Sequence, residues 1–188
     1  MASRLFAALA LLAALRVDAA EVSGVRLDDK ATVESRELVL NGAGLRTRFR
    51  IISVYVLGLY LPEKKNDAAA VLQLPGPKRA LIHMMRDVSA EQFTEAMLDG
   101  LRPNVSEAEY KALEPRLKQL MDVIAEAKEA KKGMTIAIDW TGSATRLAFN
   151  GAPVGKPIPG EDLYRALLRI WLGDNPVQDD LKKALLGG

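Results

Sequence analysis

The run FRIISVYVLGLYL at residues 49–61 constrains the fold more than any other part of the sequence. It is rich in β-branched and aromatic residues and carries no charge after Arg50, a composition that favours a buried strand. Pro62 follows and should end the strand, because proline has no backbone N–H to donate to a sheet. We therefore expect a long, mostly buried central strand.

Shorter strands are predicted on both sides of this segment. Short apolar alternation indicates strands at residues 21–27, 36–40, 80–85, 134–140, 144–149 and 152–156. Asn150-Gly151 lies between the last two and is the strongest short-range signal for a hairpin. The sequence Asn-Gly-Ala-Gly at residues 41–44 predicts a tight turn, because glycine adopts positive φ without steric cost. Residues 157–160 are expected to form a linker.

Helices are predicted between and after these strands. Ser89 with Gln92 matches a capping box, and Ser106 with Glu109 matches a second one. Pro115 should end or kink the helix that Ser106 begins, because it lacks an amide donor. Further helical segments are expected within residues 63–77, at residues 126–132 as a charged helix end stopped by Gly133, from Leu163 to the terminating Gly173, and at residues 177–186. The fold class is α+β, an antiparallel sheet with helices packed on one face.

An apolar segment precedes the first predicted strand. Residues 5–15, LFAALALLAAL, follow one basic residue, and the small residues Ala19 and Ala20 come shortly after. This is the arrangement of a secretory signal peptide, and the run is too short to span a bilayer. We predict a signal peptide at residues 1–19, cleaved after Ala19 or Ala20, and one domain at residues 20–188, periplasmic or secreted. An amphipathic first helix is the alternative, but such a helix would carry regularly spaced polar residues.

Composition excludes several classes of function. Of 26 basic and 24 acidic residues, 24 and 23 lie outside the predicted signal peptide, a balance that gives no basis for binding nucleic acid. The chain has no cysteine and one histidine, which excludes disulfides, thiolate metal sites and multi-histidine sites. No second apolar run reaches membrane length, so we expect no transmembrane segment after processing. Neither a metal nor a cofactor is indicated by these residues.

Three segments together resemble the chalcone isomerase-like family, and specifically its exported bacterial members. They are residues 40–46 leading into residues 54–61, residues 88–100, and residues 163–173 with the following Asn175-Pro176 and the closing Leu-Leu-Gly. The resemblance covers nearly all of the predicted domain. It implies a twisted antiparallel sheet, helices packed on one face, and a ligand cleft between them.

The resemblance also indicates the positions that an isomerase would use. Arg46 matches the arginine that polarises the substrate in true chalcone isomerases. The other positions differ, because Tyr55 stands for a threonine, Phe93 for a tyrosine, Ala96 for a lysine and Gly100 for an asparagine. A developing enolate needs electrostatic stabilisation that one arginine is not expected to supply. We therefore do not expect isomerase activity, and we assign no catalytic residue.

The same positions match the fatty-acid-binding members of this fold, which hold the carboxylate with an arginine after the turn and a tyrosine on the next strand. Arg46 and Tyr55 fit those two places, and a guanidinium fork with a phenol suits a carboxylate. Phe93, Ala96 and Met97 would make the cleft suitable for an acyl chain. The sequence thus predicts a non-catalytic periplasmic binding protein for a small amphipathic carboxylate, above all a fatty acid, held by Arg46, Tyr55, Phe93 and Met97.

Other hypotheses stay open from the sequence. His83 is the one imidazole and could be an axial haem ligand in an apolar cleft, although no Cys-x-x-Cys-His attachment motif is present. An isomerase or lyase acting on another small substrate is a second alternative, and a module that binds an envelope protein is a third. Arg46 could instead bind a turn carbonyl, and Tyr55 could be a core residue. Trp140 and Trp171 are expected in the core.

Overall fold

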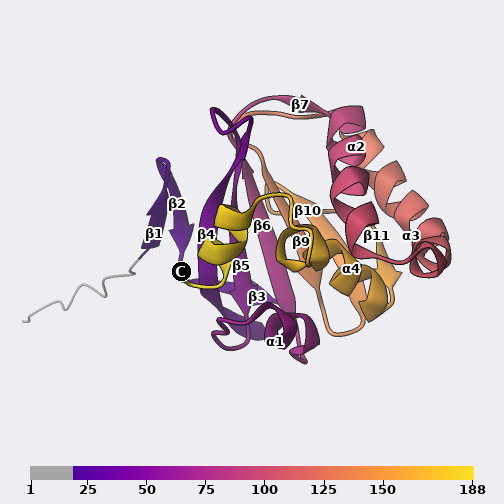
Figure 1. The fold of residues 1–188 in the computed structure, drawn as a ribbon, viewed down its shortest axis with the longest axis horizontal. Coiled ribbons are helices and arrows are strands. Elements are labelled where there is room, and N and C mark those ends of the chain that lie inside the picture. Colours follow the sequence, from indigo (N-terminus) through magenta and orange to yellow (C-terminus); the bar gives the residue numbers. More distant parts are fainter. Residues whose placement is uncertain (1–18) are drawn as a thin grey trace, which may run out of the picture.

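The computed structural model describes residues 19–188 and is built on a seven-stranded antiparallel sheet (Figure 1). The strands lie in the order β11-β10-β9-β6-β5-β4-β3. They are β3 (Lys30–Val33), β4 (Arg36–Arg48), β5 (Ile52–Leu61), β6 (Lys78–Met84), β9 (Thr135–Trp140), β10 (Ala144–Phe149) and β11 (Ala152–Pro159). The predicted signal peptide, apart from Ala19, lies outside the described residues.

Helices cover one face of this sheet, as Figure 1 shows. They are α1 (Ala68–Gln73), α2 (Ala90–Leu101), α3 (Glu107–Glu126), α4 (Glu161–Leu172) and α5 (Asp179–Leu185), with the 3₁₀ turn η1 (Arg102–Asn104) after α2. The short strands β7 (Val88–Ser89) and β8 (Glu129–Ala130) pair beside the start of α2. The predicted α+β class, with helices on one face of an antiparallel sheet, is confirmed. No helix within residues 19–188 is long and apolar enough to cross a membrane.

The opposite face is covered in part by a hairpin of β1 (Ala19–Val22) and β2 (Val25–Asp28). A second, smaller core lies under it and includes Val25, Leu27, Val56 and Tyr60. The Tyr60 hydroxyl donates a hydrogen bond to the Asp28 carbonyl oxygen at 2.9 Å. The single strand predicted at residues 21–27 is wrong, because Ser23 and Gly24 turn the chain there with φ of 51° and 80°.

The predicted central strand is confirmed, with a different beginning. Strand β5 pairs with β4 on one edge and with β6 on the other. Alternate residues enter two cores, Leu57 and Leu59 under the helices and Val56 and Tyr60 under the hairpin, which explains an apolar run without polar alternation. The strand begins at Ile52 rather than at residue 49, because residues 48–51 form the turn after β4.

The tight turn predicted at residues 41–44 is wrong. These residues lie inside β4, and their glycines serve the close approach of α5. A Cβ added to Gly42 would lie 2.1 Å from the Ala184 carbonyl oxygen, and one added to Gly44 would lie 2.8 Å from the Leu181 Cδ1. The Asn41 side chain also donates a hydrogen bond to the Leu185 carbonyl oxygen at 2.7 Å. The motif therefore forms the surface of β4 on which α5 packs.

Of the other local sequence signals, the helix caps and the hairpin turn are confirmed, whereas the proline in α3 does not end the helix. The Ser89–Gln92 capping box is present in full, and Ser106 caps α3 by accepting from the Glu109 amide at 3.1 Å. The hairpin turn at Asn150-Gly151 is also confirmed, with φ of 49° and 80°. Helix α3 nevertheless runs through Pro115, because the buried face of this helix on both sides of the proline holds it against the core.

Two smaller predictions of boundaries are wrong, and one strand was not predicted. The charged run at residues 126–132 is not a helix end, because α3 stops at Glu126 and residues 129–130 pair with β7 as β8. The linker predicted at residues 157–160 is mostly strand, since β11 continues to Pro159. Strand β3 carries no alternation long enough to be predicted, and its pairing with β4 defines it.

Replacing Gly42 by alanine tests how the packing of α5 on β4 contributes to stability. The new Cβ would strike backbone carbonyl groups of α5, which cannot move without displacing the helix, so we expect a loss of about 1–3 kcal/mol in the free energy of unfolding. Gly58→Ala in the neighbouring strand is the matched control, because its Cβ would meet side-chain atoms at 3.2 Å or beyond. Urea unfolding of both variants measures the difference, and equal stabilities would contradict the assignment.

Candidate ligand-binding site

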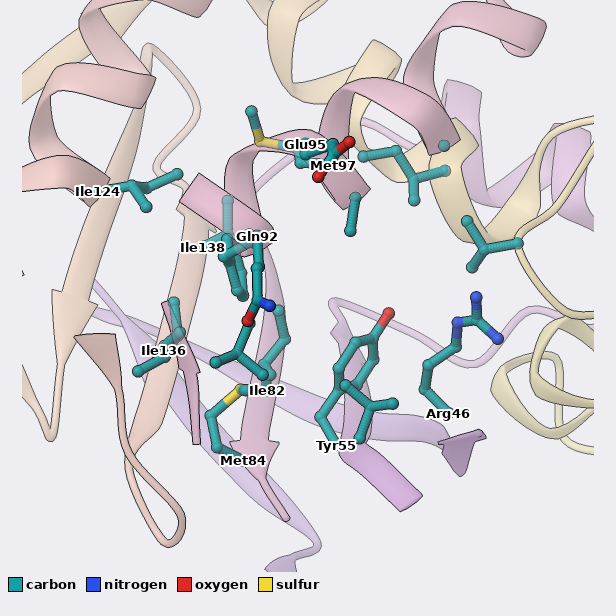
Figure 2. A pocket seen from close by; sticks show the side chains of 18 of the residues that line it. Arg46, Tyr55, Ile82, Met84, Gln92, Glu95, Met97, Ile124, Ile136 and Ile138 are labelled. Atoms are coloured by element: carbon teal, nitrogen blue, oxygen red, sulfur yellow. The ribbon is translucent and has the colours of Figure 1, made fainter. Parts of the chain in front are cut away.

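A cavity of about 580 Å³ lies between the sheet and the helices α2, α3 and α4 (Figure 2). Its sheet wall consists of branched and sulfur-containing side chains of β6 and β9, and its helix wall is largely apolar. The apolar lining includes Ile82, Met84, Ile136, Ile138, Leu147, Phe93, Met97, Leu120, Ile124, Leu167 and Ile170. A lining of this kind excludes water and accepts hydrocarbon.

The periodicity of each element decides which side chains reach the cavity. Successive strand residues point to opposite faces, so Ile82 and Met84 of β6 face the helices while His83 faces the other way. On α2, residues three and four positions apart share one side, which brings Phe93, Ala96 and Met97 to the same wall. The local pattern of the sequence therefore determines much of the apolar lining.

One end of the cavity is polar. Arg46 of β4 and Tyr55 of β5 are direct cross-strand partners, so their side chains emerge side by side from the same face. Figure 2 shows the guanidinium and the phenol at one end, with Ile124, Ile136 and Ile138 at the other. The cavity is therefore amphipathic along its length.

The hydroxyl of Tyr55 is held by a tryptophan and keeps its own proton available. The Trp171 indole Nε1 donates to the Tyr55 oxygen at 2.8 Å. Burial raises the pKa of the Tyr55 phenol above its ordinary value, while the hydrogen bond from Trp171 and the nearby charge of Arg46 lower it in part. Among residues 19–188 no acceptor takes the phenolic proton. Tyr55 is thus a neutral donor aimed at the cavity at physiological pH.

Arg46 is positioned by Gln178, the N-cap residue immediately before α5. Its Nη1 donates to the Gln178 Oε1 at 3.3 Å and to the Thr47 carbonyl oxygen. Gln178 is itself fixed to the backbone of β4, accepting from the Thr47 amide at 2.9 Å and donating to the Leu45 carbonyl oxygen at 3.0 Å. Both partners of the guanidinium are neutral oxygens.

No carboxylate within residues 19–188 pairs with Arg46. A guanidinium has five N–H donors in a planar fork, so several donors remain for a ligand. Arg48 and Arg86 also line the cavity, while Glu95, Asp99 and Glu129 line its rim on the side of α2 and β8. Figure 2 shows the Glu95 side chain apart from the Arg46 guanidinium.

The structure brings four predicted ligand residues together and leaves one apart. Arg46, Tyr55, Phe93 and Met97 all line the cavity. His83 does not, since it shares the face of Leu81 and Met85, which pack on the smaller core. Haem ligation by His83 within this cavity therefore has no geometric support, and the roles of the other four in binding stay predictions.

A family model described as chalcone isomerase-like matches residues 19–187. The chain belongs to the chalcone isomerase-like family. Among solved structures it is similar to a fatty-acid binding protein of Arabidopsis thaliana, with a TM-score of 0.67 and 13% identity, covering 87% of this chain and 92% of that one. No curated protein sequence matches the chain. At this identity the structural likeness shows the chalcone isomerase-like fold, which the sequence predicted.

The five positions that the resemblance compares with catalytic residues of chalcone isomerases all line the cavity. Arg46, Tyr55, Phe93, Ala96 and Gly100 line it together. Close packing explains the glycine at position 100, because a Cβ there would lie 2.8 Å from methyl carbons of both Ile170 and Val177. A larger residue at position 100 would therefore require the side chains of Ile170 and Val177 to shift.

Two residues that position the polar end were missed from the sequence. Gln178 has no local signal, because its role depends on α5 packing across β4, more than a hundred residues away in the chain. Trp171 was expected to be a core residue, and it is buried, but its indole N–H bonds to Tyr55. The rule that a buried indole N–H usually finds a partner was the available signal.

Replacing Trp171 by phenylalanine should raise the pKa of the Tyr55 phenol further, because the phenolate loses a stabilising donor. Tyrosine-labelled NMR titration checks this, with Tyr55→Phe assigning the resonance and Trp140→Phe as the matched control. The folded-state pKa is raised, so the stability contributed by Tyr55 is complete below pH 10 and declines as pH rises through the folded-state value. An unchanged pKa in Trp171→Phe would show that the bond does not act on the phenol.

Proposed function

We propose that the protein is a non-catalytic binding protein for an amphipathic carboxylate, a fatty acid, held in this cavity. One observation carries the proposal. An arginine without a carboxylate partner within residues 19–188 stands beside a tyrosine with an available proton, at one end of a largely apolar cavity. A ligand with one anionic end and one apolar end complements both parts.

The carboxylate is assigned to Arg46 and Tyr55. A charged carboxylate accepts from a guanidinium and from a phenol at once, and bonds of this charge-assisted kind are the stronger ones in proteins. Gln178 holds the guanidinium before any ligand arrives, which reduces the side-chain entropy lost on binding. Tyr55 is neutral and donates, so it adds no repulsion.

The acyl chain is assigned to the cavity between β6, β9 and the helices. A volume of about 580 Å³ falls within the range of roughly 300–1,000 Å³ that is usual for small-molecule sites. Each methylene group buried there contributes about 0.8 kcal/mol, so the tail supplies most of the affinity. The fatty-acid binding protein of Arabidopsis thaliana shares the fold, which supports this assignment.

Alanine at Arg46 tests the head group. We expect fatty-acid affinity to fall about 10- to 100-fold, as for a lost hydrogen bond to a charged group, and about tenfold for Tyr55→Phe. Arg50→Ala is the matched control, because Arg50 is exposed on the neighbouring turn and does not line the cavity. Calorimetry with a fatty acid gives the affinities.

A fatty alcohol of the same chain length distinguishes loss of the ion pair from damage to the cavity. The alcohol lacks the carboxylate, so its weaker binding should be the same in the parent protein and in Arg46→Ala. Equal fatty-acid affinity in the two proteins would refute the assignment of the head group. An equal loss for the acid and the alcohol would assign Arg46 to the fold of the cavity instead.

We also propose that the protein acts outside the cytoplasm, in line with the apolar segment at residues 5–15. Intact-mass measurement of protein from the periplasm or the medium of an expressing bacterium should show a chain that begins at Ala20 or Glu21. A chain that keeps residues 1–19 and is recovered from the cytoplasm would contradict export. The outcome does not affect the assignment of the cavity.

A further inference from the structure

The tip of the β4–β5 hairpin, residues 48–52, carries large apolar side chains that are exposed to solvent. Phe49 is 75% exposed and Ile51 is 83% exposed. Neither residue lines the cavity, and neither belongs to a core. Figure 1 shows this hairpin projecting at one end of the sheet, beside the connection that contains β7.

The residues of this turn do not suit its backbone. The Ile51 amide bonds to the Arg48 carbonyl oxygen at 3.3 Å, and the central residues Phe49 and Arg50 have φ of 53° and 61°. Hairpin turns with two positive φ angles favour Asn-Gly and similar pairs, and the turn at Asn150-Gly151 follows that preference. A phenylalanine here contributes neither to the turn nor to a core. An exposed phenylalanine at this position therefore indicates contact with a binding partner.

Basic side chains surround the tip. Arg48 and Arg50 belong to it, and backbone bonds from Met85 to Val54 at 2.9 Å and from Gly133 to Met84 at 2.8 Å bring the next two connections to the same end of the sheet. These connections add the exposed residues Arg86, Lys131 and Lys132. Within residues 19–188 none of the five basic residues Arg48, Arg50, Arg86, Lys131 and Lys132 forms an ion pair.

Acidic groups at this end are fewer and partly engaged. Asp87 accepts from the Lys132 amide at 2.7 Å, and Glu129 follows Lys128 in the chain. Arg48 also lies over the Phe49 ring, 5.2 Å from its centroid, which directs one positive charge toward the apolar tip. The end of the sheet therefore combines a small apolar wedge with a surrounding excess of positive charge.

We propose that this end of the sheet docks on an anionic lipid surface. Phe49 and Ile51 enter the boundary between headgroups and acyl chains, while Arg50, Lys131 and Lys132 lie against lipid phosphates. Apolar side chains flanked by basic residues bind membranes in this way. A lipid surface fits better than a protein partner, because a stable protein interface buries roughly 800 Å² on each side, which calls for a wider apolar centre than two side chains provide.

A fluorescent label measures the depth of the tip directly. The chain contains no cysteine, so Phe49→Cys gives a single attachment point for an environment-sensitive dye. Ser143→Cys is the control, because Ser143 is exposed just past the Trp140 end of β9, which pairs with the opposite end of β6. Both variants are made in the full chain, so residues 1–18 are the same in each. The probes are vesicles of phosphatidylglycerol with phosphatidylcholine and vesicles of phosphatidylcholine alone.

Docking predicts a blue shift of the dye at position 49 with the anionic vesicles, absent with neutral vesicles and absent at position 143. Without a dye, Phe49→Ser with Ile51→Ser should weaken sedimentation with anionic vesicles about tenfold or more. Each of Arg50→Gln, Lys131→Gln and Lys132→Gln should weaken it about fivefold. Equal dye shifts at positions 49 and 143, or equal binding to both vesicle types, would overturn the proposal. Binding of the tip to an envelope protein, without vesicle binding, would also overturn it.

The result is independent of the proposed function. Fatty-acid affinity in solution should be unchanged in Phe49→Ser with Ile51→Ser, because neither side chain lines the cavity. A protein that binds fatty acid but no vesicles refutes docking alone. A protein that docks through the tip but binds no fatty acid refutes the proposed ligand alone.

Discussion

The packing of the C-terminal helix α5 across strand β4 is the contact on which the polar end of the cavity depends. Gly42 leaves room for the backbone of α5 and Gly44 for its side chains, and the Asn41 side chain donates a hydrogen bond to the end of α5. The first consequence is structural, because a helix from the end of the chain is fixed on a strand near its beginning. The second is functional, because this packing places Gln178 where it bonds to both Arg46 and the β4 backbone. A glycine-rich strand thereby positions a guanidinium without supplying it a counter-ion.

That arrangement has an energetic consequence for the free protein. The half-buried Arg46 guanidinium donates to neutral oxygens, and no carboxylate within residues 19–188 pairs with it. A bound carboxylate would supply the missing opposite charge. Any ligand that binds the folded state alone stabilises it in proportion to the logarithm of its concentration over its dissociation constant. Occupancy of the site by such a ligand would therefore raise the stability of the fold.

Sequence reasoning succeeded where the deciding interactions are local. The Ser89 capping box, the Asn150-Gly151 turn and the buried run of β5 depend on neighbours within a few residues, and all three are present. The glycines of residues 41–44 have two meanings, since a turn and a close approach of another backbone both require glycine. Only the distant α5 distinguishes them. The roles of Gln178 and Trp171 were not predicted, because their hydrogen-bond partners are distant in the sequence. Arg46 and Tyr55 were expected at the cavity from the resemblance, which carries information about the folded chain, and both line it.

One pair of strands links the two proposals geometrically. Arg46 and Tyr55 are partners in the β4–β5 register, and the turn that follows β4 begins at Phe49, three residues after Arg46. At about 3.4 Å for each residue of an antiparallel strand, the head-group site is roughly 10 Å from the hairpin tip. A wedge that enters a bilayer interface by about 5–10 Å would bring Arg46 close to the level of the lipid headgroups. Arg48 and Arg86 also line the cavity, and their positive charges would favour the entry of an anionic ligand.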